Sequence, residues 1–187
     1  MGRASRDNLK SFDDLVMPRL LARHWHVDLA HEAMRIYADP VAMHFLAPNY
    51  PVRDEAHMRA NIERICALNA THNRPMGSWP LFDKNTDELV GTVLLKPLPN
   101  SERIEVGWHV ARDMWGQGYA TEAGRAALVH GFENLGLEKI HAIVNPENAP
   151  SIRVTERLGM THLGRTTEYH DRSLEFFVIE RGEIPTA

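Results

Sequence analysis

The sequence is poor in cysteine and has no cluster of positive charge, and each shortage argues against a class of protein. Cys66 is the only cysteine among 187 residues. An intrachain disulfide is therefore impossible, which fits a reducing compartment such as the cytoplasm. The formal net charge is −4, and Lys and Arg form no basic block. This argues against nucleic acid as the main partner, because binding to a phosphate backbone needs clustered cations.

Long apolar runs and targeting signals are also missing. No segment approaches the roughly 18 apolar residues that cross a membrane, and the polar N-terminus lacks the pattern of a secretory signal. Met1-Gly2 does not open a myristoylation motif, because Arg6 stands where Ser or Thr is required. We therefore expect a cytoplasmic protein with no membrane partner.

The sequence contains no internal repeat and no low-complexity linker, so one domain is expected at this length. Periodicity and turn signals predict strands near residues 19–25, 78–82, 88–95, 103–110, 139–144, 161–166 and 174–180, and helices near residues 28–38, 54–72, 118–135 and 148–159. This order of elements predicts an α+β domain around one sheet. We expect a flexible segment over residues 1–12, the domain over residues 13–182 and a tail over residues 183–187.

The most informative segment is WGQGYATEA at residues 115–123. It follows a predicted strand and opens a predicted helix. Two glycines at the start of a helix expose consecutive backbone N–H groups, and the first turn of a helix has free donors and a partial positive charge. The segment therefore predicts a cradle for an anion, most often a phosphate.

Two common nucleotide motifs do not fit this turn. A Rossmann fingerprint needs a third glycine where Thr121 stands, and an acidic residue at the end of the next strand, where the sequence has Asn145-Pro146. A P-loop needs Gly-Lys-Ser/Thr, which does not follow. Nicotinamide and nucleotide-hydrolysing functions are therefore disfavoured, and coenzyme A is the other ligand class to consider.

Several segments together resemble the GNAT acetyltransferase superfamily, and most of all its RimJ/RimL-like, ribosomal-protein-type branch. The resemblance lies in IEVGW at residues 104–108 through Glu122-Ala123, in NPENAPS at 145–151, in ERLGM at 156–160 and in PRLLAR at 18–23. It implies a single GNAT domain whose central, mostly antiparallel, twisted sheet of about seven strands is flanked by helices. One departure is Trp115, which stands where the superfamily's phosphate motif begins with Gln or Arg.

The resemblance implies an acetyl-CoA-dependent N-acetyltransferase. Its acceptor would be a primary amine, either a protein N-terminus or a small molecule, in a groove formed by residues 42–73 and 168–173. A coenzyme A-binding sensor or a catalytically inactive homologue is the alternative, because either would keep the phosphate cradle. The sequence leaves the oligomeric state open, and a homodimer is compatible with it.

The same resemblance implies where coenzyme A would bind. The backbone at the end of the 103–110 strand would hold the pantetheine arm, and the glycine turn would wrap the pyrophosphate. Asn148 would contact the pantetheine or cap the helix that follows it, and both readings are open. The expected coenzyme residues are Val110, Gly116, Gln117, Gly118, Tyr119, Ala120, Thr121, Asn148 and Ser151.

Acetyl transfer also needs a neutral amine. A lysine amine is neutral in only about one molecule in 2,500 at pH 7, and a peptide α-amine in roughly one in six, so a general base matters more for lysine. By resemblance, Glu105 is the first candidate base and Glu168 the second, although Glu105 could also be a purely structural strand carboxylate. His109 and His170 are further candidates, because a neutral imidazole has a suitable pKa.

The departing thiolate and the carbonyl oxygen need partners as well. Ser151 is the candidate acid, placed near the sulfur by the resemblance, although it could equally complete a helix cap. The N–H of Val110 is the candidate donor to the carbonyl oxygen.

A metal site is not expected, although the sequence has eleven histidines. His24 and His26 would share a face of a strand with His31 nearby, but no third ligand follows at a convincing spacing.

Overall fold

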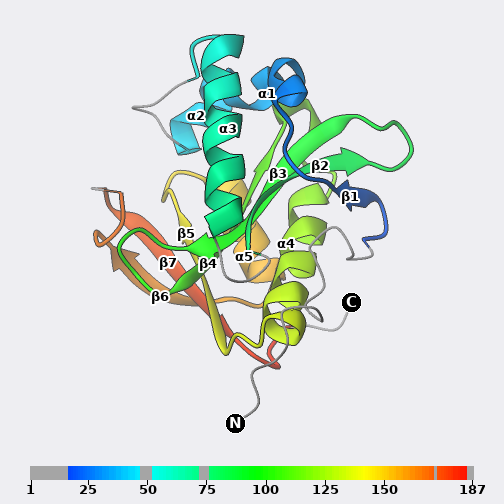
Figure 1. Cartoon of the computed structure of the whole chain (residues 1–187). Helices are drawn as coiled ribbons and strands as arrows, with labels where there is room; N and C mark the ends of the chain where they lie inside the picture. Colours follow the sequence, from blue (N-terminus) through cyan, green and yellow to red (C-terminus); the bar gives the residue numbers. More distant parts are fainter. Residues whose placement is uncertain (1–16, 47–51, 72–75, 171, 185–187) are drawn as a thin grey trace.

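The computed structural model describes residues 17–46, 52–71, 76–170 and 172–184. The expected segment at residues 1–12 and the end of the expected tail lie outside these ranges. In the described part the strands are β1 (Leu20–Ala22), β2 (Gly77–Asp83), β3 (Leu89–Pro97), β4 (Ile104–Val110), β5 (Lys139–Val144), β6 (Thr161–Thr166) and β7 (Leu174–Glu180). The α-helices are α1 (Ala30–Tyr37), α2 (Pro40–Leu46), α3 (Glu55–Thr71), α4 (Tyr119–Val129) and α5 (Ala149–Arg157) (Figure 1).

The seven strands form one sheet in the order β1-β2-β3-β4-β5-β7-β6. Every neighbouring pair is antiparallel except β4 and β5, which run parallel. This confirms the α+β class and the mostly antiparallel sheet. The parallel contact is short, with a single registered pair between Glu105 and His141.

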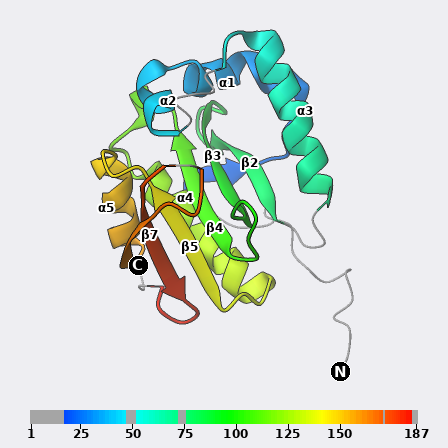
Figure 2. The same ribbon diagram turned by 90° about the vertical axis from the view of Figure 1, so that its left-hand side faces the viewer.

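Helices cover both faces of the sheet (Figure 2). On one face, α4 packs against β3 and β4 and α5 packs against β5, and they enclose the larger apolar core. On the other face, α1 and α3 pack against each other over β2 and β3, around a smaller core. The close fit of α4 depends on Gly124, where an added Cβ would lie 2.8 Å from Leu158 and 3.2 Å from Trp108.

Most predicted elements have the predicted bounds, and the differences have local causes. The strand predicted near residues 19–25 ends at Ala22, although Arg23 N–H still donates to Pro80 O (3.1 Å). Pro80 has no N–H to donate in return, so the ladder stops there. The helix predicted to reach residue 135 is α-helical to Val129 and continues as a π-helix over His130–Asn134.

No helix in the described part is both long enough and apolar enough to cross a membrane.

Candidate active site

Two clefts in the described part of the structure share one wall. The larger has a volume of about 1250 Å³ and the smaller about 290 Å³; they are called here the large cleft and the small cleft. Six residues line both: Phe45, Leu46, Trp108, His109, Asn148 and Ser151. A group that passes from a ligand in one cleft to a ligand in the other would do so at this shared wall.

The small cleft contains the glycine turn at the start of α4. Gly116 and Gly118 have φ angles of 78° and 83°, in the left-handed region that residues with a Cβ rarely adopt. Gly118 is the N-cap of α4, and no side chain caps the N–H groups of the first turn. Tyr119, Ala120 and Thr121 of this turn line the cleft. The turn therefore has the open backbone donors that an anion cradle requires.

Side chains from distant parts of the chain hold this turn in place. The Arg19 Nε donates to Glu122 Oε2 (2.7 Å), and its Nη1 donates to the carbonyl of Gln117 (2.8 Å). The Tyr119 hydroxyl donates to Asp83 Oδ2 (2.5 Å), which lowers the pKa of the Asp83 carboxyl. The turn is thus fixed from β1 and from the end of β2 before any ligand binds.

Trp115 ties the turn to β4. Its indole Nε1 donates to Val110 O at 2.8 Å, so the residue that departs from the family motif links the end of the strand to the cradle. Ala111 N–H donates to Val90 O of the preceding ladder position. Alternation along an antiparallel ladder then turns the N–H of Val110 away from β3, toward the side where the small cleft lies.

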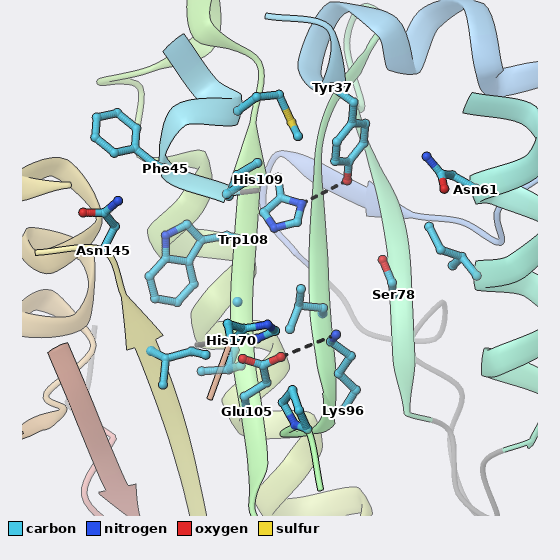
Figure 3. A pocket seen from close by; sticks show the side chains of 18 of the residues that line it. Tyr37, Phe45, Asn61, Ser78, Lys96, Glu105, Trp108, His109, Asn145 and His170 are labelled. Carbon is cyan, nitrogen blue, oxygen red and sulfur yellow. Dashed lines mark hydrogen bonds and ion pairs between the residues drawn. The ribbon is translucent and has the colours of Figure 1, made fainter. Parts of the chain in front are cut away.

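Glu105 lies in the wall of the large cleft (Figure 3). Its residue surface is only 7% exposed, and its carboxylate is 3.5 Å from Lys96 Nζ, across the β3–β4 pair. Burial raises the pKa of Glu105, and the nearby Lys96 cation opposes part of that rise. A buried carboxylate with a raised pKa is a stronger proton acceptor once ionised.

His109, four residues further along β4, is held by a hydrogen-bonded chain. Its Nδ1 is 3.0 Å from the Tyr37 hydroxyl, which donates to Thr92 Oγ1, also at 3.0 Å. Burial lowers the pKa of His109 to about 4 and raises that of Tyr37 to about 12. The imidazole is therefore neutral at pH 7.

Asn148 and Ser151 form the N-terminal cap of α5. The Asn148 side chain accepts from Ser151 N–H at 3.1 Å, so Asn148 caps α5, and its contact with pantetheine stays a prediction. Both residues also line the two clefts, and the cap uses the backbone of Ser151 rather than its hydroxyl.

The other candidate bases, Glu168 and His170, differ in whether they line a cleft. The Glu168 side chain is 65% exposed and pairs with Arg103 at 3.1 Å, and it is not among the described residues that line either cleft. His170 does line the large cleft, and it is labelled among the lining residues in Figure 3. On this evidence, Glu105 is the carboxylate that borders the cleft.

Eight of the nine residues expected to hold coenzyme A line the small cleft: Val110, Gly116, Gly118, Tyr119, Ala120, Thr121, Asn148 and Ser151. Gln117 is the exception. Its side-chain amide lies 3.5 Å from Asp113 O, and its carbonyl accepts from Arg19.

The histidines noted in the sequence do not gather around one point. Within the described ranges, no group of three His, Cys, Asp or Glu side chains could hold a metal ion. His26 pairs with Asp28 and His31 with Glu55.

A family model described as "Acetyltransferase (GNAT) domain" matches residues 19–161, which is more than half of the chain. The chain belongs to the GNAT acetyltransferase family.

Relatives of this GNAT chain act on different acceptors. It is 30% identical to the FsC-acetyl coenzyme A-N(2)-transacetylase of Aspergillus fumigatus, over 84% of this chain and 70% of the relative. It is 27% identical to the [ribosomal protein uS5]-alanine N-acetyltransferase of Escherichia coli, over 83% and 81%. The solved structure of Mycobacterium smegmatis RimJ in complex with CoA-disulfide has a TM-score of 0.70 at 23% identity, over 90% of this chain and 85% of the other. That last match supports the fold alone.

The small cleft of this GNAT domain has the chemistry that an acyl-CoA needs. Open backbone donors suit a pyrophosphate, and Arg153 and Arg157 of α5 line the same cleft and can pair with further phosphate charge. GNAT enzymes use acetyl-CoA as their acyl donor, and the donor set of this cleft is compatible with it.

Several residues of the GNAT site could not be assigned from the sequence. Arg19 and Glu122 stood within segments that carried the family resemblance, but nothing in the sequence indicated that they pair. Tyr37 stood in a segment, Tyr37 to Pro40, that also fits the family, but nothing in the sequence indicated that Tyr37 contacts His109 or that Lys96 pairs with Glu105, because these partners lie 72 and 9 positions apart.

Proposed function

We propose that the chain transfers an acetyl group from acetyl-CoA to a primary amine, either a protein N-terminus or a small molecule. The observation that carries this proposal is the meeting of two clefts, one with an anion cradle and the other with a buried carboxylate. The relatives support both kinds of acceptor, since one is described as acting on a ribosomal protein alanine and another as an N(2)-transacetylase.

In the proposed reaction acetyl-CoA lies in the small cleft and the amine enters through the large cleft. The amine nitrogen attacks the thioester carbonyl, and a C–N bond forms while the carbonyl oxygen gains negative charge. The N–H of Val110 is oriented toward that side of β4 and would stabilise this oxygen. Collapse of the intermediate then breaks the C–S bond.

Two protons must move for the reaction to balance. Glu105 stands five residues before Val110 on β4, about 16 Å along an extended strand, so the proton on the attacking nitrogen would reach the Glu105 carboxylate through water in the large cleft. Burial raises the pKa of Glu105 and makes it a better final acceptor than an ordinary carboxylate. The departing thiolate would accept a hydrogen bond from the Ser151 hydroxyl at the shared wall, and a proton passed on through this hydroxyl would be replaced from water, so that Ser151 ends unchanged. With a thiol pKa near 8.5, a weak acid is sufficient.

The test is the release of thiol from acetyl-CoA across a panel of amines, combined with calorimetric titration of acetyl-CoA. We expect saturable binding of acetyl-CoA and thiol release that depends on an added amine, with the acetylated amine identified by mass spectrometry. Tight binding without thiol release for any amine would support a sensor or an inactive homologue. Absence of acetyl-CoA binding would overturn the proposal.

A further inference from the structure

We infer that the preferred acceptor is an amine that also bears a carboxylate, and that arginines in the large cleft recognise this carboxylate. The inference rests on the proposed acetyl transfer and concerns which amines the cleft accepts.

The charge of the large cleft is opposite to that of the chain. The chain has a formal net charge of −4. The described residues that line the cleft nevertheless include four cationic side chains, Arg53, Arg64, Lys96 and Arg172, against one carboxylate, Glu105. Lys96 and Glu105 form an ion pair with each other, as the dashed line in Figure 3 shows. Among the described lining residues, three arginines then have no carboxylate to balance their charge.

These arginines are not neutralised by carboxylates within the described part of the chain. Arg172 Nη2 donates to two main-chain carbonyls at the end of α2, Phe45 O (3.4 Å) and Leu46 O (2.9 Å). Arg64 Nη2 lies 3.5 Å from the neutral Asn61 side chain. Partial burial lowers the pKa of Arg172, because the buried guanidinium cation loses part of its hydration. A bound anion would stabilise this cation and offset the loss.

Arg59 lies on the same helix as Arg64 but, unlike Arg64, is paired with carboxylates of the described residues. It pairs with Glu55 at 3.1 Å and with Asp28 at 3.9 Å, and it is not among the residues that line the cleft. An arginine of α3 that faces away from the cleft thus has carboxylate partners, whereas the one that borders the cleft has none in the described ranges. This distribution is what an anion-binding lining requires.

The coenzyme phosphates do not account for this charge. The cations beside the phosphate cradle are Arg153 and Arg157, which line the small cleft only. Arg53, Arg64 and Arg172 line the large cleft only, and the shared wall separates the two sets. A polyamine or a lysine-rich segment would bring more positive charge to an already cationic lining, which disfavours binding.

A carboxylate beside an amine can come from two sources. It can be the α-carboxylate of a free amino acid, or an acidic side chain close to the N-terminus of a peptide. Matched acceptors separate them: an amino acid against its amide, and a peptide with Glu at its second and third positions against its Gln twin. We expect the carboxylate member of at least one pair to have about tenfold higher kcat/KM, with the difference shrinking as salt is raised.

Variants of the arginines in the large cleft test which of them recognise the carboxylate of the acceptor. Arg53→Gln and Arg64→Gln change exposed residues and leave the cradle intact, so each should raise KM for the carboxylate acceptor about three- to fivefold. KM for acetyl-CoA should stay the same, and so should KM for the neutral twin. Arg59→Gln is the matched control, with the same loss of charge on the same helix outside the cleft, and it should change neither KM.

The inference is overturned if neutral or basic amines are acetylated as well as their carboxylate twins, or if Arg59→Gln raises KM as much as Arg64→Gln. In those outcomes the proposed acetyl transfer still stands, because thiol is released. If acetyl-CoA binds and no amine of any charge releases thiol, the proposed function itself fails.

Discussion

The small cleft and the large cleft share a wall, but the chain builds them in different ways. The cradle of the small cleft comes from one short stretch, Gly116 to Thr121, and consists mainly of backbone N–H groups at a helix start. The large cleft takes its polar groups from side chains on α1, α3, β3 and β4 and on the loops that carry Arg53, His170 and Arg172, and burial shifts the pKa values of Tyr37, Glu105 and His109 among them. A site made of backbone tolerates a side-chain change such as Trp115 in its motif, whereas a site made of buried side chains depends on each partner.

This difference predicts that changes in the large cleft alter turnover or KM for the amine, and that changes in the small cleft alter KM for acetyl-CoA. The largest effect is expected for Glu105→Gln, which removes the proposed base while keeping its shape. Turnover at pH 7 should fall at least tenfold and up to about a hundredfold, with partial recovery at high pH as more amine loses its proton. KM for acetyl-CoA should change little, and steady-state thiol release from pH 5.5 to 9.5 measures both.

The dependence of turnover on pH in the unmodified chain shows in which direction the pKa of Glu105 is shifted. Because burial raises the pKa of Glu105, the acid limb of the profile should fall off at higher pH than it would for an ordinary carboxylate. Glu168→Gln is the matched control and should have little effect. A larger loss for Glu168→Gln than for Glu105→Gln would transfer the assignment to Glu168.

The next largest effect is expected for Gly118→Val in the small cleft. A β-branched residue at a φ of 83° is strained by at least 1–2 kcal/mol, so the turn must shift and KM for acetyl-CoA should rise about tenfold. Gly118→Asn is the control, since Asn tolerates the left-handed conformation. If both variants bind acetyl-CoA as well as the unmodified chain does in calorimetry, the cradle lies elsewhere.

Ser151→Ala tests the shared wall and should cost less, about fivefold in turnover, because a single hydrogen bond contributes about 0.5–1.5 kcal/mol. The cap of α5 uses Ser151 N–H, so the melting temperature should be unchanged. Asn148→Ala should instead lower the melting temperature through loss of the cap, which costs about 1 kcal/mol. A loss of turnover above a thousandfold for Ser151→Ala would mean that protonation of the thiolate limits the reaction.

The smallest effect is expected for Trp115→Phe. It removes the hydrogen bond from the indole to Val110 O and should raise KM for acetyl-CoA about threefold, with turnover unchanged. A lower KM would show that the indole competes with the pantetheine for this carbonyl. It would contradict the interpretation that Trp115 stabilises the glycine turn by linking it to β4.

Local sequence patterns predicted much of the fold. The bounds of β5, β6 and β7 agree with the predicted ranges, because these short runs are flanked by clear turn residues. The start of α4 was also predicted from the sequence, because a glycine pair comes before a helix with an Ala-rich apolar face. This pattern predicts an anion cradle at the helix start and close packing of the helix on the sheet. β1 came out shorter than predicted because its length depends on Pro80, a residue of another strand.

Local sequence patterns could not decide whether Glu105 or Glu168 is the better candidate for the base. Glu105 and Glu168 were both acidic residues in or near strands, and the sequence ranked them only by resemblance. The difference between them is burial: one is 7% exposed beside Lys96, and the other has a side chain 65% exposed beside Arg103. Burial is set by what packs on top of a residue, which a single strand cannot encode.

The sequence by itself therefore determined the family, the order of the elements and the glycine turn at the start of α4, because each is written in short local motifs along the chain. Only the tertiary structure decided that Tyr37 holds His109, that Lys96 opposes Glu105, and that arginines without a carboxylate partner in the described ranges line the large cleft. These features depend on distances and on burial between segments far apart in sequence, and it is burial that sets the pKa values and the uncompensated charge on which the proposed chemistry rests.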